Sequence, residues 1–236
     1  MAVTLEVCVD DSAGLAAAVK GGADRIELCA ALPLGGLTPS IGFMAEAAQC
    51  GLQVMAMIRP RAGGFVYSEA ELTQMEVDIA AASAAGLAGV VIGASLPDGA
   101  LDLPALARLC AAAEGMDLTL HRAFDLVPDP AEALEQALTL PFSRILTSGG
   151  KPRATESIPE LAALIHQAAG RISIMPGSGI SAETAPLFTP LGITEIHGSC
   201  SRCVAVSGRA VDLGFGPANE RRTDAALVQA LKQALR

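Results

Sequence analysis

The sequence predicts a single (β/α)8 barrel over residues 1–236, and three observations favour this fold class. The chain has 236 residues, near the ~250 of a usual barrel of this kind. Eight short β-prone runs begin 21 to 36 residues apart, which leaves room for one helix in each gap. Hydrophobic residues make up 51% of the chain, with no Trp and one Tyr, so we expect the aliphatic core that buried parallel sheets have.

Helix signals lie in the gaps between these runs. Capping residues accept hydrogen bonds from the first free N–H groups of a helix, and they follow several of the predicted strands. An open doubly wound sheet would usually carry a dinucleotide fingerprint after its first strand, whereas Asp10-Asp11-Ser12 stands there. The eight predicted strands are Val3–Val9, Asp24–Cys29, Gln53–Arg59, Gly89–Gly93, Leu118–Arg122, Arg144–Ser148, Arg171–Met175 and Ile193–Gly198. The predicted capping residues are Ser12, Ser68 with Glu71, Asp129 with Glu132, and Ser181.

Charge and the amino terminus argue against several classes of partner. The formal net charge is −9, and the pair Arg221-Arg222 is the one basic cluster, so we expect no nucleic-acid partner. The amino terminus lacks the basic start of a signal peptide, and the uncharged span Ile79–Pro97 is interrupted by glycines. We therefore expect a cytoplasmic protein that has no membrane partner. The six cysteines are then expected to be free thiols.

Polar side chains share one face of several predicted strands, where they alternate with aliphatic residues. If the aliphatic face lies under the helices, the polar set points into the barrel. Active sites of such barrels lie at the carboxyl ends of the strands, and buried carboxylates need a cationic or metal partner. The alternative is a charge network that serves stability alone. The residues expected to converge in a catalytic site are Glu6, Glu27, Arg59, His121 and His197.

A glycine-rich run after the seventh predicted strand suggests an anion site. Glycines let the backbone approach a ligand, and the N-terminus of a following helix, capped by Ser181, would add free N–H groups. Barrels often bind phosphate at this place. The alternative is an ordinary glycine turn with a helix cap. The residues expected to bind the anion or an anionic cofactor are Gly177, Ser178, Gly179, Gly198 and Ser199.

Cys8 and Cys29 form a candidate metal site. Each follows an inward-facing glutamate by two residues, on predicted strands that are neighbours in a barrel of this order. Two thiolates suffice for a soft ion such as Cu(I), although cysteine is also a common core residue. Cys200 and Cys203 form a lone C-x-x-C with no second pair, which is a weak metal or redox signal.

Several long motifs are similar to those of the copper-homeostasis CutC family: LEVCVD, GGADRIELCAALPLGGLTPS, MIRPRAGGFVYSEAE, LHRAFD, RILTSGG, IMPGSGI and IHGS. The resemblance spans residues 3 to about 199 and does not include the C-x-x-C. It implies a TIM-like barrel, a cytoplasmic location and a role in copper tolerance or trafficking. The barrel-mouth residues that it implies are Glu6, Cys8, Glu27, Cys29, Arg59, Arg61, His121, Arg122, Asp125, Ser148 and His197.

Three hypotheses of function follow. The first is a copper-homeostasis protein in which Cys8 and Cys29 bind Cu(I). The second is a barrel enzyme that acts on a small anionic or phosphorylated metabolite, with His121 and a glutamate as acid and base. The third is a metal-free scaffold whose apolar surface serves assembly, which the charged barrel mouth disfavours. Self-association into a homo-oligomer stays open in all three.

Overall fold

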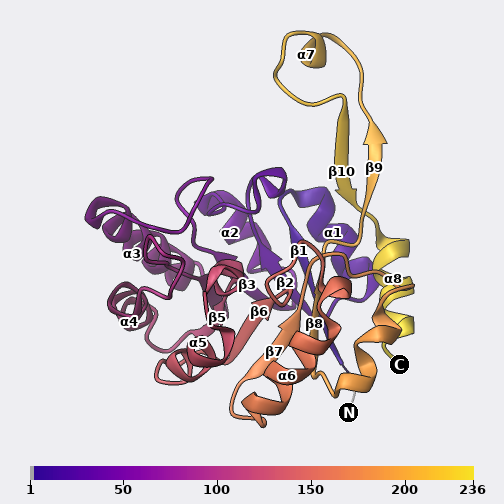
Figure 1. The fold of residues 1–236 in the computed structure, drawn as a ribbon. Coiled ribbons are helices and arrows are strands. Elements are labelled where there is room, and N and C mark those ends of the chain that lie inside the picture. The colour runs from indigo at the N-terminus through magenta and orange to yellow at the C-terminus, as the bar shows by residue number, and fades with distance from the viewer. Residues whose placement is uncertain (1–2) are drawn as a thin grey trace.

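Eight parallel strands curl into a nearly closed barrel in the computed structural model, which describes residues 3–236 (Figure 1). Neighbouring strands pair in the order β7-β6-β5-β4-β3-β2-β1-β8. At the seam between β7 and β8, the hydroxyls of Ser173 and Thr194 lie 3.1 Å apart. The TIM-like barrel that the sequence predicts is confirmed. Its strands are β1 Thr4–Val9, β2 Arg25–Leu28, β3 Gln53–Met57, β4 Gly89–Ile92, β5 Asp117–Leu120, β6 Arg144–Thr147, β7 Ser173–Pro176 and β8 Glu195–Gly198.

Helices cover the outside of the barrel, and their caps match the sequence signals in part. Ser68 and Glu71 form the predicted capping box, and Asp129 caps its helix by accepting from two backbone N–H groups. The cap at Ser12 is wrong by one residue, because the Asp11 carboxylate accepts from Gly14 N–H. The helices are α1 Ser12–Gly21, α2 Ile41–Ala47, α3 Glu69–Ala84, α4 Leu103–Ala112, α5 Pro130–Ala137, α6 Ile158–Ala168, α7 Arg209–Asp212 and α8 Ala225–Ala234.

The helix expected after β7 with Ser181 as its cap is not formed. Two short 3-10 helices, Ala185–Leu187 and Thr189–Leu191, take its place. Pro186 and Pro190 explain the difference, since each lacks an N–H donor and clashes with the preceding turn of an α-helix. This prediction is therefore wrong.

Alternate residues along each strand face the helices and the barrel interior, as predicted. The aliphatic residues of β1 and β2, among them Leu5, Val7 and Ile26, are fully buried in the large hydrophobic cluster under the helices. Residues of the opposite parity, such as Met55 and Met57, pack in a separate small cluster. Each strand thus presents one face to the helices and the other to the barrel interior.

A chain of ion pairs crosses the interior near the amino ends of the strands. Arg25 Nε lies 2.5 Å from Glu6 Oε2, and Arg25 Nη2 lies 2.8 Å from Glu195 Oε2. Arg144 continues the chain, with Nε 2.8 Å from Glu195 and Nη2 2.7 Å from Asp117 Oδ2. Both arginines are buried. Glu6 is thus part of an ion-pair network in this layer, through its bond to Arg25.

The chain beyond the barrel forms an arm that the sequence signals did not predict. Strands β9 Ser201–Ala205 and β10 Asn219–Thr223 pair as an antiparallel hairpin that projects from the barrel, with α7 at its tip (Figure 1). Helix α8 then returns and packs on α1. Gly21 permits this contact, because a Cβ at that position would lie 2.5 Å from Val228 Cβ.

Among the helices of the described residues 3–236, none has the length and apolar character that a membrane crossing requires.

Removing the charge of Arg25 is expected to destabilise the fold. The substitution Arg25→Met leaves Glu6 as a buried carboxylate with half of its cationic partners, and such a loss costs about 3–5 kcal/mol. Urea unfolding followed by circular dichroism measures this change. Arg171→Met is the matched control, since the Arg171–Glu135 pair is exposed and is expected to contribute less than about 1 kcal/mol. Equal losses in the two variants would contradict the structural role of the interior network.

Candidate functional site

A cavity of about 1290 Å³ opens at the carboxyl end of the barrel. The loops after several strands and the base of the projecting hairpin contribute to its wall. Some of the predicted residues do not line it: Glu6, Cys29, Arg61, Asp125, Ser148 and Gly177. Those that do line it are Cys8, Glu27, Arg59, His121, Arg122, Ser178, Gly179, His197, Gly198 and Ser199.

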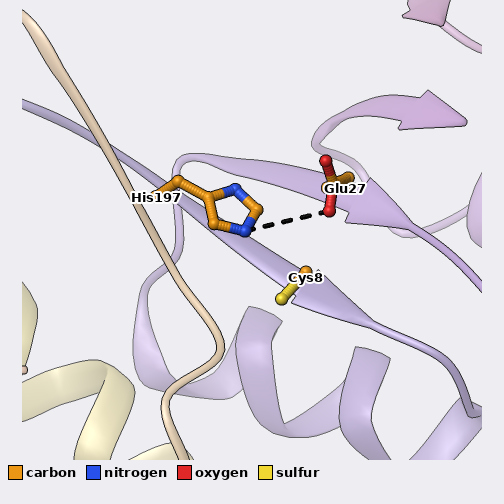
Figure 2. A group of neighbouring side chains, drawn as sticks. All are labelled: Cys8, Glu27 and His197. Carbon is orange, nitrogen blue, oxygen red and sulfur yellow. Dashed lines mark ion pairs between the residues drawn. The ribbon is translucent and has the colours of Figure 1, made fainter. Parts of the chain in front are cut away.

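Cys8, Glu27 and His197 bring a thiol, a carboxylate and an imidazole together on one wall (Figure 2). One potential ligand atom from each residue lies within 4.8 Å of the other two, and all three residues are buried. The sheet register explains the grouping: Cys8 stands beside Glu27 in the β1–β2 pair, and His197 stands beside Glu6 in the β1–β8 pair. Three adjacent strands therefore present these groups from two successive inward-facing positions of the register.

Glu6 orients the imidazole of His197 from below the cavity. His197 Nδ1 lies 2.9 Å from Glu6 Oε1, whereas Nε2 lies 3.8 Å from Glu27 Oε2, beyond hydrogen-bond distance. A carboxylate on one ring nitrogen fixes the ring and leaves the other nitrogen for a ligand, as in many metal sites. Glu27 Oε1 is also buried and has no hydrogen-bond partner among the described residues. This wall thus has two atoms that could bind a ligand, His197 Nε2 and Glu27 Oε1.

Charges in this group are strongly coupled. Burial alone would raise the pKa of Glu6, but His197 and Arg25 outweigh it and lower the pKa to about 2. Burial, helped by the nearby Glu6 charge, raises the pKa of Glu27. For His197 burial alone would lower the pKa, but Glu27, Cys8 and Glu6 together raise it well above 6.5. Without a bound ligand, a positive imidazolium therefore sits between the two glutamates.

Cys29 lies behind this wall. Its thiol donates to Glu27 Oε2 over 3.5 Å, and it packs with Met55 and Met57 in the small interior cluster. Burial, followed by the Glu27 charge, raises the pKa of Cys29 well above 9.0. Cys29 is not in the group of three neighbouring metal-ligating residues that Cys8, Glu27 and His197 form, and a metal site shared by Cys8 and Cys29 stays a prediction.

A second wall carries Arg59, Phe65 and His121. The rings of Phe65 and His121 have centroids 4.7 Å apart, and the Arg59 guanidinium lies 5.1 Å from the Phe65 centroid. Gly93 makes room for the imidazole, because a Cβ there would lie 2.3 Å from His121 Cε1. Burial, with the Arg59 charge, lowers the pKa of His121 to about 3. This histidine is therefore neutral at physiological pH, unlike His197.

The remaining barrel-mouth residues implied by the resemblance have structural contacts. Asp125 accepts from the Thr147 hydroxyl at 2.5 Å and from Ser148 N–H at 3.0 Å, and it pairs with Arg122 Nε at 2.6 Å. It thereby ties the loops after β5 and β6 together. Arg61 pairs with Glu71 outside the cavity, with its side chain 41% exposed.

The anion site expected after β7 lacks two of its assumed donors. Gly177 N–H donates to Thr147 O at 3.0 Å, and Ser181 N–H donates to the Thr184 hydroxyl at 2.9 Å. Between β7 and β8 the described chain forms two short 3-10 helices and no α-helix that could present its N-terminus, so this part of the prediction is wrong. Ser178 and Gly179 both have φ of 75° and line the cavity. An anion contact by these two residues stays a prediction.

The C-x-x-C does not form one site. Cys200 is buried beside the barrel, whereas Cys203 is exposed on β9. All six cysteines lie within residues 3–236 and are free. The residues that sequence reasoning missed are those of the hairpin base, such as Asn219 and Arg221, which reach the rim of the cavity. The glycines at positions 208, 214 and 216 were the turn signal between the two strands, but β10 is polar throughout, so no alternation of polar and apolar residues marked it as a strand.

Burial of neutral His121 is expected to make the fold sensitive to acid. Between its folded pKa of about 3 and the unfolded value of 6.5, the unfolded chain binds more protons, so stability is full above pH 6.5 and falls toward pH 3. In His121→Asn, the amide oxygen can replace Nδ1 as the acceptor for Ala123 N–H. Urea unfolding from pH 7 to 4 should give a shallower loss in this variant, by up to about 1.4 kcal/mol per pH unit. An identical slope would contradict a neutral His121.

Comparisons with known proteins show which family this chain resembles. The model of the CutC family matches residues 3–202. A family protein CutC from Rhizobium meliloti (strain 1021) is 58% identical over 235 residues, which cover 99% of this chain and 96% of the relative. One from Caulobacter vibrioides (strain NA1000 / CB15N) is 51% identical over 238 residues, covering 99% and 97% of the two chains. The crystal structure of CutC from Streptococcus agalactiae superposes with a TM-score of 0.80 at 36% identity, covering 84% of this chain and 99% of the other. The chain belongs to the CutC family.

Proposed function

We propose that this protein serves copper homeostasis by binding Cu(I) at the wall formed by Cys8, Glu27 and His197. The Streptococcus agalactiae relative is described as a candidate copper homeostasis protein, which supports a copper role for the family. The observation that carries the proposal for this chain is the orientation of His197, which Glu6 holds by Nδ1 while Nε2 faces Cys8 and Glu27.

The chemistry of the donor set suits the ion. Thiolate and imidazole are ligands that Cu(I) accepts readily, and Cys8 and His197 supply one of each. The Met57 thioether lines the same cavity and is a further soft donor. Glu27 contributes negative charge beside the ion through Oε2, which lies 3.8 Å from His197 Nε2.

Binding would release protons. Cys8 must lose its thiol proton, and His197, whose pKa is well above 6.5, must lose the proton on Nε2. Affinity is therefore expected to rise with pH through the neutral range. We also propose a cytoplasmic location, because the free thiols suit a reducing compartment.

Cys8→Ser is expected to abolish tight Cu(I) binding, because a hydroxyl is a poor ligand for this soft ion. Glu6→Gln is expected to weaken binding about 10- to 100-fold by releasing the orientation of His197. Anaerobic competition with a coloured Cu(I) chelator measures both effects.

Two cysteine variants serve as controls for that titration. Cys110→Ser alters a buried thiol on α4, and Cys203→Ser alters the exposed thiol of the hairpin. Both are expected to bind Cu(I) like the unmodified chain. Loss of binding in Cys203→Ser with full binding in Cys8→Ser would place the ion on the hairpin and refute the proposed site.

A further inference from the structure

Three arginines are buried in this barrel, and one of them has no counter-charge. Arg25 and Arg144 are paired with the carboxylates of the interior network. Arg59 is 6% exposed, yet no carboxylate among the described residues lies within ion-pair distance of it. A buried cation without a partner carries a large desolvation cost. Because Arg59 lines the cavity, an anion bound in the cavity could supply the missing charge.

The neighbourhood of Arg59 holds its guanidinium in place by neutral groups. Nη1 donates to Leu34 O at 2.8 Å and to Gly36 O at 3.1 Å, and Nη2 donates to Gly63 O at 2.7 Å. Its Nε is buried and donates to no described residue. The side chain is thus rigidly placed by three of its five N–H donors, and its charge and its Nε–H have no partner among the described residues.

His121 offers a second unused donor on the same wall. Its Nδ1 accepts from Ala123 N–H at 3.1 Å, which fixes the proton of the neutral ring on Nε2. That Nε2 is buried without a partner among the described residues. Because this imidazole stays neutral, with a pKa of about 3, it can donate without adding a second buried positive charge.

Glu27, on the strand β2 that neighbours β3, presents an unused acceptor. Glu27 Oε1 has no partner within residues 3–236, and Glu27 lines the cavity as Arg59 and His121 do. Buried polar atoms are rarely left unpaired, and those that are point to an absent ligand or water. The cavity volume of about 1290 Å³ greatly exceeds the space that one metal ion needs, so an organic molecule fits beside it.

We propose that this cavity binds a small hydroxy acid, whose carboxylate faces Arg59 and His121 and whose hydroxyl donates to Glu27. The N–H groups of Arg59 Nε and His121 Nε2 match the two oxygens of a carboxylate. Glu27 Oε1, as an acceptor, favours a ligand that carries a hydroxyl over one that has only a hydrogen atom at that carbon. A phosphate is a weaker match, because two of the donors expected in the loop after β7, the N–H groups of Gly177 and Ser181, are already used within the chain. This inference does not depend on copper binding.

Three small probes of equal carbon number separate the parts of this proposal. Glycerate carries both groups, propionate lacks the hydroxyls, and glycerol lacks the carboxylate. Calorimetric titration and thermal melting of the full-length, chelator-treated protein should show binding of glycerate, about tenfold or more weaker binding of propionate, and no binding of glycerol. Sodium chloride at equal ionic strength sets the baseline. If glycerate raises the melting temperature no more than chloride does, the proposal is wrong.

Variants on the donor wall give the second half of the test. Arg59→Gln and His121→Asn are each expected to weaken glycerate binding about tenfold or more. His121→Asn preserves the contact with Ala123, so it reports on the site even if Arg59→Gln loosens the loops. The matched control is Arg61→Gln, because Arg61 also donates to loop carbonyls and lies 5.3 Å from a ring, that of Tyr67, but outside the cavity. Equal weakening in Arg61→Gln, or full binding in His121→Asn, would overturn the assignment.

Discussion

The site depends on one buried carboxylate, that of Glu6. It is fully inaccessible to solvent, and its ionisation requires cationic partners on both of its oxygens. Arg25 binds Oε2 and His197 binds Oε1. The first contact joins Glu6 to the ion pairs that fill the lower barrel, and the second fixes the ring that faces the cavity. Stability and the geometry of the candidate site are therefore linked through this residue.

The two ends of the barrel interior differ in how completely their polar groups are satisfied. At the amino end, Arg25 and Arg144 each contact two acidic side chains. At the carboxyl end, Glu27, Arg59 and His121 each keep a buried atom without a partner in the described chain. Unmet hydrogen bonds are costly in a protein interior, so these three unpartnered atoms support the proposal that a ligand binds at this end. The same division is expected of a barrel whose function lies at its carboxyl face.

Much of this arrangement could be predicted from the sequence, because strand spacing and alternation are local properties. They located the eight strands and turned Glu6, Glu27 and His197 inward. Partner choice could not be predicted: Arg25 and Arg144 stand at strand starts, and only the register of the closed sheet brings them to Glu195. The prolines at positions 186 and 190 were present in the sequence, but the expected alternation of strands and helices favoured a helix there. The C-terminal hairpin has no place in that alternation.

The central claim is that Glu6 holds Nδ1 of His197 and leaves Nε2 for a ligand. Nitrogen-15 NMR of the three histidines measures this directly, because each ring nitrogen reports its own protonation. In the metal-free protein at neutral pH, His197 should be doubly protonated. On addition of Cu(I), its Nε2 should lose the proton while Nδ1 keeps it. A neutral His197 protonated on Nε2, or a ring that Cu(I) leaves unchanged, would contradict the account.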